Sequence, residues 1–180
     1  MTSTPVRRIE ACVHRAPDGG LAVAFDLLGD LDALHIPAMR PPRIANRLWE
    51  HTCFEVFIAA DGSETYHEFN LSPSGEWMAH AFRHYRDGGP LADEALDPRI
   101  AVRRLDHLLE LSATVQLDRL SAGYAAQPLQ LGLSAVIEHI HGSLSYWALR
   151  HPAGQPDFHH RDSFVLRLPG AGVDAGGNPR

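Results

Sequence analysis

The chain has 180 residues, of which 44% are hydrophobic and 21% charged, so it is long enough for one globular domain with a real core. Its formal net charge of -6 argues against a protein that binds nucleic acid, because contact with phosphates needs a basic face. All sixteen basic residues are arginine, which excludes the Schiff-base chemistry and the phosphate-binding loops that depend on lysine.

The start of the chain, its apolar stretches and its cysteines predict the compartment in which the protein is found. The start has arginines but no apolar core of a signal peptide, and no stretch approaches the roughly eighteen apolar residues of a membrane span. We therefore expect a cytoplasmic protein that does not bind a membrane. Cys12 and Cys53 have no zinc-binding spacing and are too few for a disulfide framework, so we expect two buried or half-buried free thiols. Residues 1–169 are expected to form a single domain and the glycine-rich residues 170–180 a flexible tail.

The first predicted elements form a hairpin. Hydrophobic residues alternate with other residues over residues 9–14 and again over 21–27, and the sequence PDGG between them is typical of a turn. A long ordered loop is expected over residues 29–47, because its three prolines oppose both a helix and a central strand.

The same alternation predicts most of the remaining elements. Further strands are expected at residues 52–59, 64–71, 77–84, 100–105, 108–117, 129–139, 143–150 and 162–168. One or two helical turns are expected within residues 117–126. Nine or ten strands with almost no helical pattern predict an all-β fold, an antiparallel β-sandwich.

The hairpin formed by residues 52–59 and 64–71 has the most unusual composition. A two-residue turn at Asp61 and Gly62 would place Glu55 opposite Glu68, on a face that also carries aromatic side chains. The other face is apolar enough to belong to the core. Two facing carboxylates repel each other, so an arginine, a ligand with several hydroxyl groups, or a metal ion should compensate.

Several segments together resemble a known family. The stretches LWEHTCFEVFI, YHEFNLSPSGEW, HYRDG and YWALRHPAGQPDFHHRDSF are similar to bacterial DOMON-like domains related to family 9 carbohydrate-binding modules, over roughly residues 45–168. The resemblance implies a β-sandwich with a ligand site on one concave sheet. It further implies that Trp49 stacks on a sugar ring and that Glu55, six positions later, bonds the hydroxyl groups. Trp147 is the stronger candidate for a second stacking residue and Trp77 the weaker.

The leading functional hypothesis is a non-catalytic domain that binds a sugar or a similar polyhydroxylated small molecule without a cofactor. Sugars offer apolar C–H faces and a rim of hydroxyl groups, which suit aromatic platforms ringed by polar side chains. The predicted ligand-binding residues are Trp49, Glu55, Tyr66, Glu68, Asn70, Arg86 and Trp147. Two alternatives remain open: a glycosidase that uses Glu55 and Glu68 at roughly 5 Å, and a scaffold that binds a protein partner through the mixed aromatic face.

The twelve histidines suggest a further functional alternative, which is a metal-binding protein or a hydrolase with a divalent metal as cofactor. Imidazoles two apart on a strand can share an ion, and a loop can supply a third ligand. The sequence EHIH is expected to place two histidines on one strand face. The candidate metal ligands are His139, His141, His151 and His159.

Overall fold

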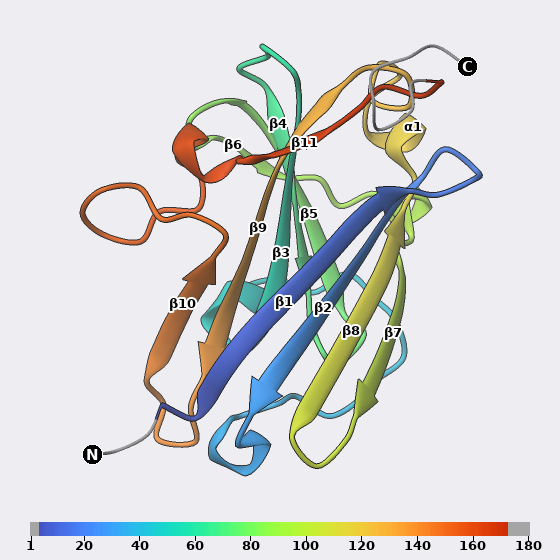
Figure 1. Cartoon of the computed structure of the whole chain (residues 1–180). Coiled ribbons are helices and arrows are strands. Elements are labelled where there is room, and N and C mark those ends of the chain that lie inside the picture. The colour runs from blue at the N-terminus through green and yellow to red at the C-terminus, as the bar shows by residue number, and fades with distance from the viewer. Residues whose placement is uncertain (1–3, 173–180) are drawn as a thin grey trace.

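Two antiparallel sheets pack face to face in the computed structural model, which describes residues 4–172 (Figure 1). The smaller sheet has the strand order β1 (Val6–Arg15), β2 (Leu21–Gly29), β8 (Leu108–Val115) and β7 (Arg99–Arg104). The larger sheet has the order β10 (Leu144–Ala148), β9 (Leu129–Glu138), β3 (Cys53–Ala60), β4 (Tyr66–Leu71), β5 (Trp77–His84) and β6 (Asp87–Pro90), and β11 (Leu166–Leu168) also pairs with β9. The predicted all-β sandwich is confirmed.

Helical structure is confined to short turns. The α-helix α1 spans Leu117–Leu120, within the predicted segment, and the 3₁₀ turns are η1 (Leu31–Ala33), η2 (Leu48–Glu50), η3 (Glu94–Leu96) and η4 (Arg161–Ser163). No helix in the part of the chain that the structure describes has the length and apolar character needed to cross a membrane. The predicted loop lies between β2 and β3, and single bridges from Leu34 to His139 and from Ile44 to Trp77 hold it against the larger sheet.

The hydrophobic core fills the space between the sheets. Alternate residues of β2 and β8 face inward, as the sequence pattern predicts, and meet the inward face of β3 and β9. Phe25 of β2 and Phe54 of β3 make the central aromatic contact, with ring centroids 4.9 Å apart. Because each fully buried side chain of this kind contributes roughly 1.5–3 kcal/mol, burial of these inner faces fixes which side of β3 and β9 faces the core.

The pairing of β3 with β4 differs from the predicted register by two residues. Glu55 lies opposite Asn70, and Glu68 lies opposite Phe57, so the two carboxylates are diagonal neighbours rather than facing each other. Gly62 has φ +77° but Asp61 does not have a positive φ, so this is not the turn type that joins strands through two residues. The connection therefore extends over residues 61–65. A slip of two residues keeps every side chain on its predicted face.

Strand β6, the two cysteines and the start of the predicted tail can also be compared with the sequence-based expectations. Strand β6 was not predicted, because its sequence DGGP lacks the hydrophobic alternation of a strand. Cys12 is exposed, so the expectation that it would be buried or half-buried was wrong, whereas Cys53 is buried, and both are free. In the predicted tail, the Ala171 amide donates to the carbonyl of Ala126. Residues 173–180 lie outside the described part of the chain.

Candidate ligand-binding site

A pocket of about 530 Å³ lies on the face of the larger sheet that points away from the smaller one. Its floor comes from β3, β4, β5 and β9, and its rim comes from η2, β10 and the segment between β10 and η4. The residues lining it are Trp49, Glu50, Glu55, Glu68, His80, Phe82, Arg86, Val136, Leu144, Tyr146, Pro156, Phe158 and His159.

Strand pairing places the acidic groups of the floor side by side. Glu55 on β3 lies between Asn70 on β4 and Ser134 on β9. Glu68 on β4 lies opposite His80 on β5. Because side chains on neighbouring strands share a face when their backbones pair, these five residues point into the same side of the sheet.

Both carboxyl groups are buried and hydrogen-bonded. Glu55 is 3% exposed and accepts a hydrogen bond from Ser134 Oγ at 3.1 Å, and Glu68 is 6% exposed and accepts one from Asn70 Nδ2 at 2.8 Å. Burial, and to a smaller extent the neighbouring Glu68, raises the pKa of Glu55 well above its ordinary value. Burial raises the pKa of Glu68 to about 7. The pair therefore holds protons to a higher pH than exposed carboxyl groups do, and a protonated carboxyl group can donate a hydrogen bond as well as accept one.

The raised pKa values favour protonation, which relieves the repulsion between these two groups, and Arg86 adds a smaller attraction for the Glu68 carboxylate. Arg86 reaches the pocket, but its Nη2 lies 2.9 Å from Asp157 Oδ1 and its Nε donates to the hydroxyl of Tyr85 at 3.2 Å. Among residues 4–172, no arginine forms an ion pair with Glu55 or Glu68. Of the three means of compensation expected from the sequence, an arginine lying between the two carboxyl groups is not found in the described residues.

Tyr66 lies beneath the pocket and orients a histidine in its wall. The Tyr66 hydroxyl accepts a hydrogen bond from the Arg86 amide at 3.1 Å and lies 2.9 Å from His159 Nδ1. Burial, with a smaller contribution from Arg86, lowers the pKa of His159 to about 4, so the ring is neutral at neutral pH. A tyrosine hydroxyl that donates to Nδ1 leaves the ring proton on Nε2, which lies 3.7 Å from Glu68 Oε2.

Aromatic side chains form the rim of the pocket. Trp49 on η2 is 42% exposed and stands edge-on to His80, with ring centroids 5.8 Å apart. On the β10 side, Tyr146 is 47% exposed and contacts Phe158 edge to face at 6.2 Å. The rim thus offers accessible ring surface above the polar floor.

Six of the seven predicted ligand-binding residues gather at this pocket. Trp49, Glu55, Glu68 and Arg86 line it, and Tyr66 and Asn70 lie directly beneath, where they hold His159 and Glu68. Trp147 does not line it. That residue lies on the opposite face of β10, beside Phe25 and Leu133 in a small gap at the edge of the sandwich.

Sequence reasoning passed over Tyr146, Phe158 and His80, and considered His159 only as a metal ligand. Tyr146 pairs with Val136 of β9 and shares the pocket face, whereas Trp147 pairs with Ala135 of the core face. The alternation of apolar and other residues along β9, read through its pairing with β10, could have shown which of these two aromatic residues faces the pocket. Trp77, the weaker candidate, is buried in the core against Phe69.

The four histidines predicted as metal ligands do not come together. Strand β9 ends at Glu138, so His139 and His141 are not two apart on one strand, and His141 lies exposed in the following turn. His139 Nε2 lies 3.1 Å from the hydroxyl of Ser145. His151 contacts Phe158 at the surface, and His159 belongs to the pocket.

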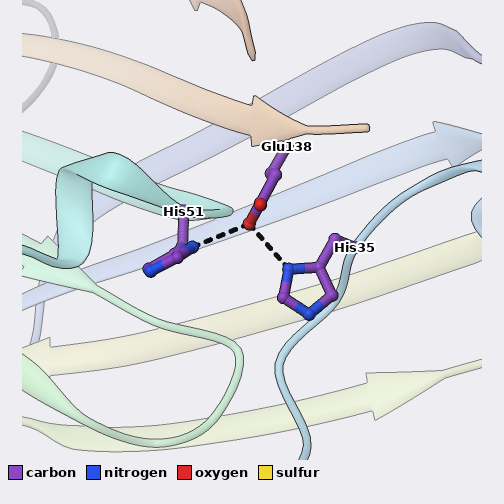
Figure 2. A group of neighbouring side chains, drawn as sticks. All are labelled: His35, His51 and Glu138. Atoms are coloured by element: carbon purple, nitrogen blue, oxygen red, sulfur yellow. Dashed lines mark hydrogen bonds and ion pairs between the residues drawn. The ribbon is translucent and has the colours of Figure 1, made fainter. Parts of the chain in front are cut away.

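Another group of side chains has metal-ligand geometry. Within residues 4–172, His35, His51 and Glu138 bring one ligand atom each to within 4.8 Å of the others (Figure 2). His35 comes from the loop after η1, His51 follows η2, and Glu138 ends β9. None of these residues was singled out from the sequence.

Comparison with known proteins identifies the fold. No protein-family model and no curated protein matches the sequence. A crystal structure from Bacteroides uniformis, described as that of a candidate carbohydrate-binding protein, is similar with a TM-score of 0.62 and 14% identity, covering 89% of this chain and 85% of that one.

Two structures of a family 9 carbohydrate-binding module from Caldicellulosiruptor kristjanssonii are also similar. The complex with cellotriose gives a TM-score of 0.52 at 11% identity, and the complex with glucose 0.53 at 10%. They cover 99% of this chain and 83% and 84% of the modules. The chain therefore has the β-sandwich fold of the family 9 carbohydrate-binding modules.

Proposed function

We propose that the pocket binds a sugar or a similar polyhydroxylated small molecule and performs no chemistry on it. The observation that carries the proposal is the pair of buried carboxyl groups, Glu55 and Glu68, beneath the exposed ring of Trp49. A polar floor under an aromatic rim matches the two kinds of surface that a sugar ring presents.

The chemistry of the floor suits hydroxyl groups better than a charged ligand. Burial raises the pKa of Glu55 and of Glu68, which favours their neutral forms, and His80 and His159 are neutral because burial lowers the pKa of each ring. Neutral carboxyl and imidazole groups both donate and accept, as a hydroxyl group does. The volume of about 530 Å³ lies within the range of pockets that hold small ligands.

The register of β3 and β4 removes the sequence-based argument for a retaining glycosidase. A retaining glycosidase holds its two carboxyl groups about 5–5.5 Å apart, a spacing that direct pairing of Glu55 with Glu68 would have supplied. Their diagonal placement removes that reason for a catalytic role. Fold similarity to modules solved with cellotriose and glucose supports the binding role, although one fold can host many functions.

Titration of mono- and disaccharides followed by tryptophan fluorescence and NMR tests the proposal. A sugar that binds should perturb Trp49, and Trp49→Ala should weaken its binding about tenfold or more because a stacking surface is lost. Trp147→Phe is the matched control, since Trp147 faces away from the pocket. If no sugar perturbs the folded protein, or if both variants weaken binding equally, the proposal is wrong.

A further inference from the structure

We propose that His35, His51 and Glu138 form a binding site for a divalent first-row transition metal ion, with zinc as the ion to test first. Two imidazole groups and one carboxylate converge from three separate segments of the chain (Figure 2). This is a mixed nitrogen and oxygen ligand set of the kind that zinc, cobalt and nickel accept.

Both rings aim the same atom at the same oxygen. His35 Nδ1 lies 2.6 Å from Glu138 Oε2, and His51 Nδ1 lies 2.8 Å from it. The ring centroids are 6.1 Å apart and the rings are nearly perpendicular, at 76°. Two donors directed at a single oxygen define a small polar centre, and an ion could replace their hydrogen bonds there.

The backbone around this centre is held in place by one buried side chain. The Thr52 hydroxyl donates to the carbonyl of His35 at 2.7 Å and accepts from the amide of Glu138 at 3.1 Å. The His35 amide also donates to the Glu138 carbonyl at 2.8 Å. Since Thr52 follows His51 directly and is fully buried, the backbones of all three proposed ligands are fixed relative to one another.

The three ligand atoms, which lie within 4.8 Å of one another, have to rearrange for an ion to enter. With zinc bonds of roughly 2.0–2.1 Å and tetrahedral angles, ligand atoms lie about 3.3 Å apart. The two short contacts to Glu138 Oε2 would therefore have to lengthen by about half an ångström or slightly more, which small side-chain rotations provide. A neutral imidazole can bind metal through Nδ1 when its proton resides on Nε2.

The exposure of the histidines leaves room for further ligands. The side chains of His35 and His51 are 56% and 54% exposed, whereas that of Glu138 is 17% exposed. Water could complete the coordination of an ion held by three protein atoms. None of the three residues lines the pocket, so this proposal does not depend on sugar binding.

Titration of tag-free protein with zinc chloride, by calorimetry in a buffer that does not chelate metals, tests the site. We expect one zinc ion per chain, and cobalt in its place should give the visible absorption bands of a coordinated ion. His51→Ala and Glu138→Gln should each weaken zinc binding at least tenfold. His141→Ala is the matched control, because His141 is exposed and lies only three residues beyond Glu138.

The outcomes separate a metal site from an ordinary network of hydrogen bonds. Circular dichroism of each variant establishes that it is folded, and NMR of ring nitrogens adds a readout that does not depend on substitution. A zinc-induced shift of the Nδ1 signals of His35 and His51 would support the site. Absence of zinc binding, or equal loss in His141→Ala and His51→Ala, would overturn it.

Discussion

The larger sheet has two acidic centres whose pKa values shift in opposite directions. One is the pocket pair Glu55 and Glu68, and the other is the single Glu138. The pocket pair is buried without an ion pair to an arginine, and burial raises the pKa of both groups. Burial also raises the pKa of Glu138, but hydrogen bonds from His35 and His51 outweigh it and hold that pKa below its ordinary value. Strand β9 contributes to both centres, through Ser134 and Glu138.

The difference shows how the position of a carboxyl group in the sheet determines whether it is neutral or charged. In the middle of the sheet a carboxylate loses its hydration and takes a proton, so it becomes a neutral hydrogen-bonding group suited to hydroxyls. At the end of a strand, partners from loops and remaining water keep the charge. The same residue type therefore suits the proposed sugar site in one place and the proposed cation site in the other.

The largest expected effect comes from removing the titratable group of Glu68. Its pKa is about 7 in the folded protein and near 4.5 when unfolded, so the folded state binds more protons between these values and loses stability as the pH rises. Glu68→Gln keeps an acceptor for Asn70 and removes this loss. We expect the variant to match the wild type below pH ~4.5 and to exceed it by roughly 3 kcal/mol above pH ~7.

Urea unfolding at several pH values measures this difference. Glu64→Gln is the control, because Glu64 is the same residue type at an exposed position of the β3–β4 connection. A pH-independent gap between Glu68→Gln and the wild type would mean that the pKa of Glu68 is the same in the folded and the unfolded protein.

A smaller effect is expected from Tyr66→Phe, which removes the hydroxyl between the Arg86 amide and His159. The cost should be about 1–2 kcal/mol of unfolding free energy, because a partly buried amide and a partly buried ring nitrogen lose their partner. The pKa of His159 should rise from about 4, but only in part, since burial is the main cause of its low value.

Histidine NMR titration follows the His159 ring directly. Tyr146→Phe removes an exposed hydroxyl from the pocket rim and should leave both the stability and the His159 titration unchanged. An unchanged His159 pKa in Tyr66→Phe would argue against a hydrogen bond to Nδ1.

The smallest effect is expected from Glu138→Gln in metal-free buffer. The side chain is near the surface, and its two partners are more than half exposed, so loss of the charge should cost less than about 1 kcal/mol. Thermal unfolding with a chelator present measures it. If Glu138→Gln lost as much unfolding free energy as Glu68→Gln gains, the proposed difference in burial between the two centres would be wrong.

The fold could be predicted from the sequence because hydrophobic alternation shows which face of a strand is buried, even when the strand pairing is predicted wrongly by two residues. The predicted hairpin was wrong by two residues, since Gly62 alone adopts a positive φ in a five-residue connection. That error did not move Glu55 or Glu68 to the other face, because side-chain orientation repeats every two residues. The polar floor was therefore identified on the correct face, while the spacing of its carboxyl groups was not.

The rim and the histidine centre could not be predicted to the same degree. β10 is partly exposed on both faces, so alternation there does not show which of Tyr146 and Trp147 faces the pocket. His35 and Glu138 are 103 residues apart, and only the bridge between the long loop and the end of β9 brings them together. A contact of this kind depends on the order of strands in the sheet, which local patterns do not encode.

The position of Cys12 has a practical consequence. Ile9 and Val13 of β1 pack on the core, so Cys12 points outward from the smaller sheet, on the side of the sandwich opposite the pocket. Cys53, the other thiol, is buried, and burial raises its pKa well above the ordinary value. A maleimide linker would therefore attach at one place, and molecules immobilised through it would all present the pocket to the solution, as a glycan-screening surface requires.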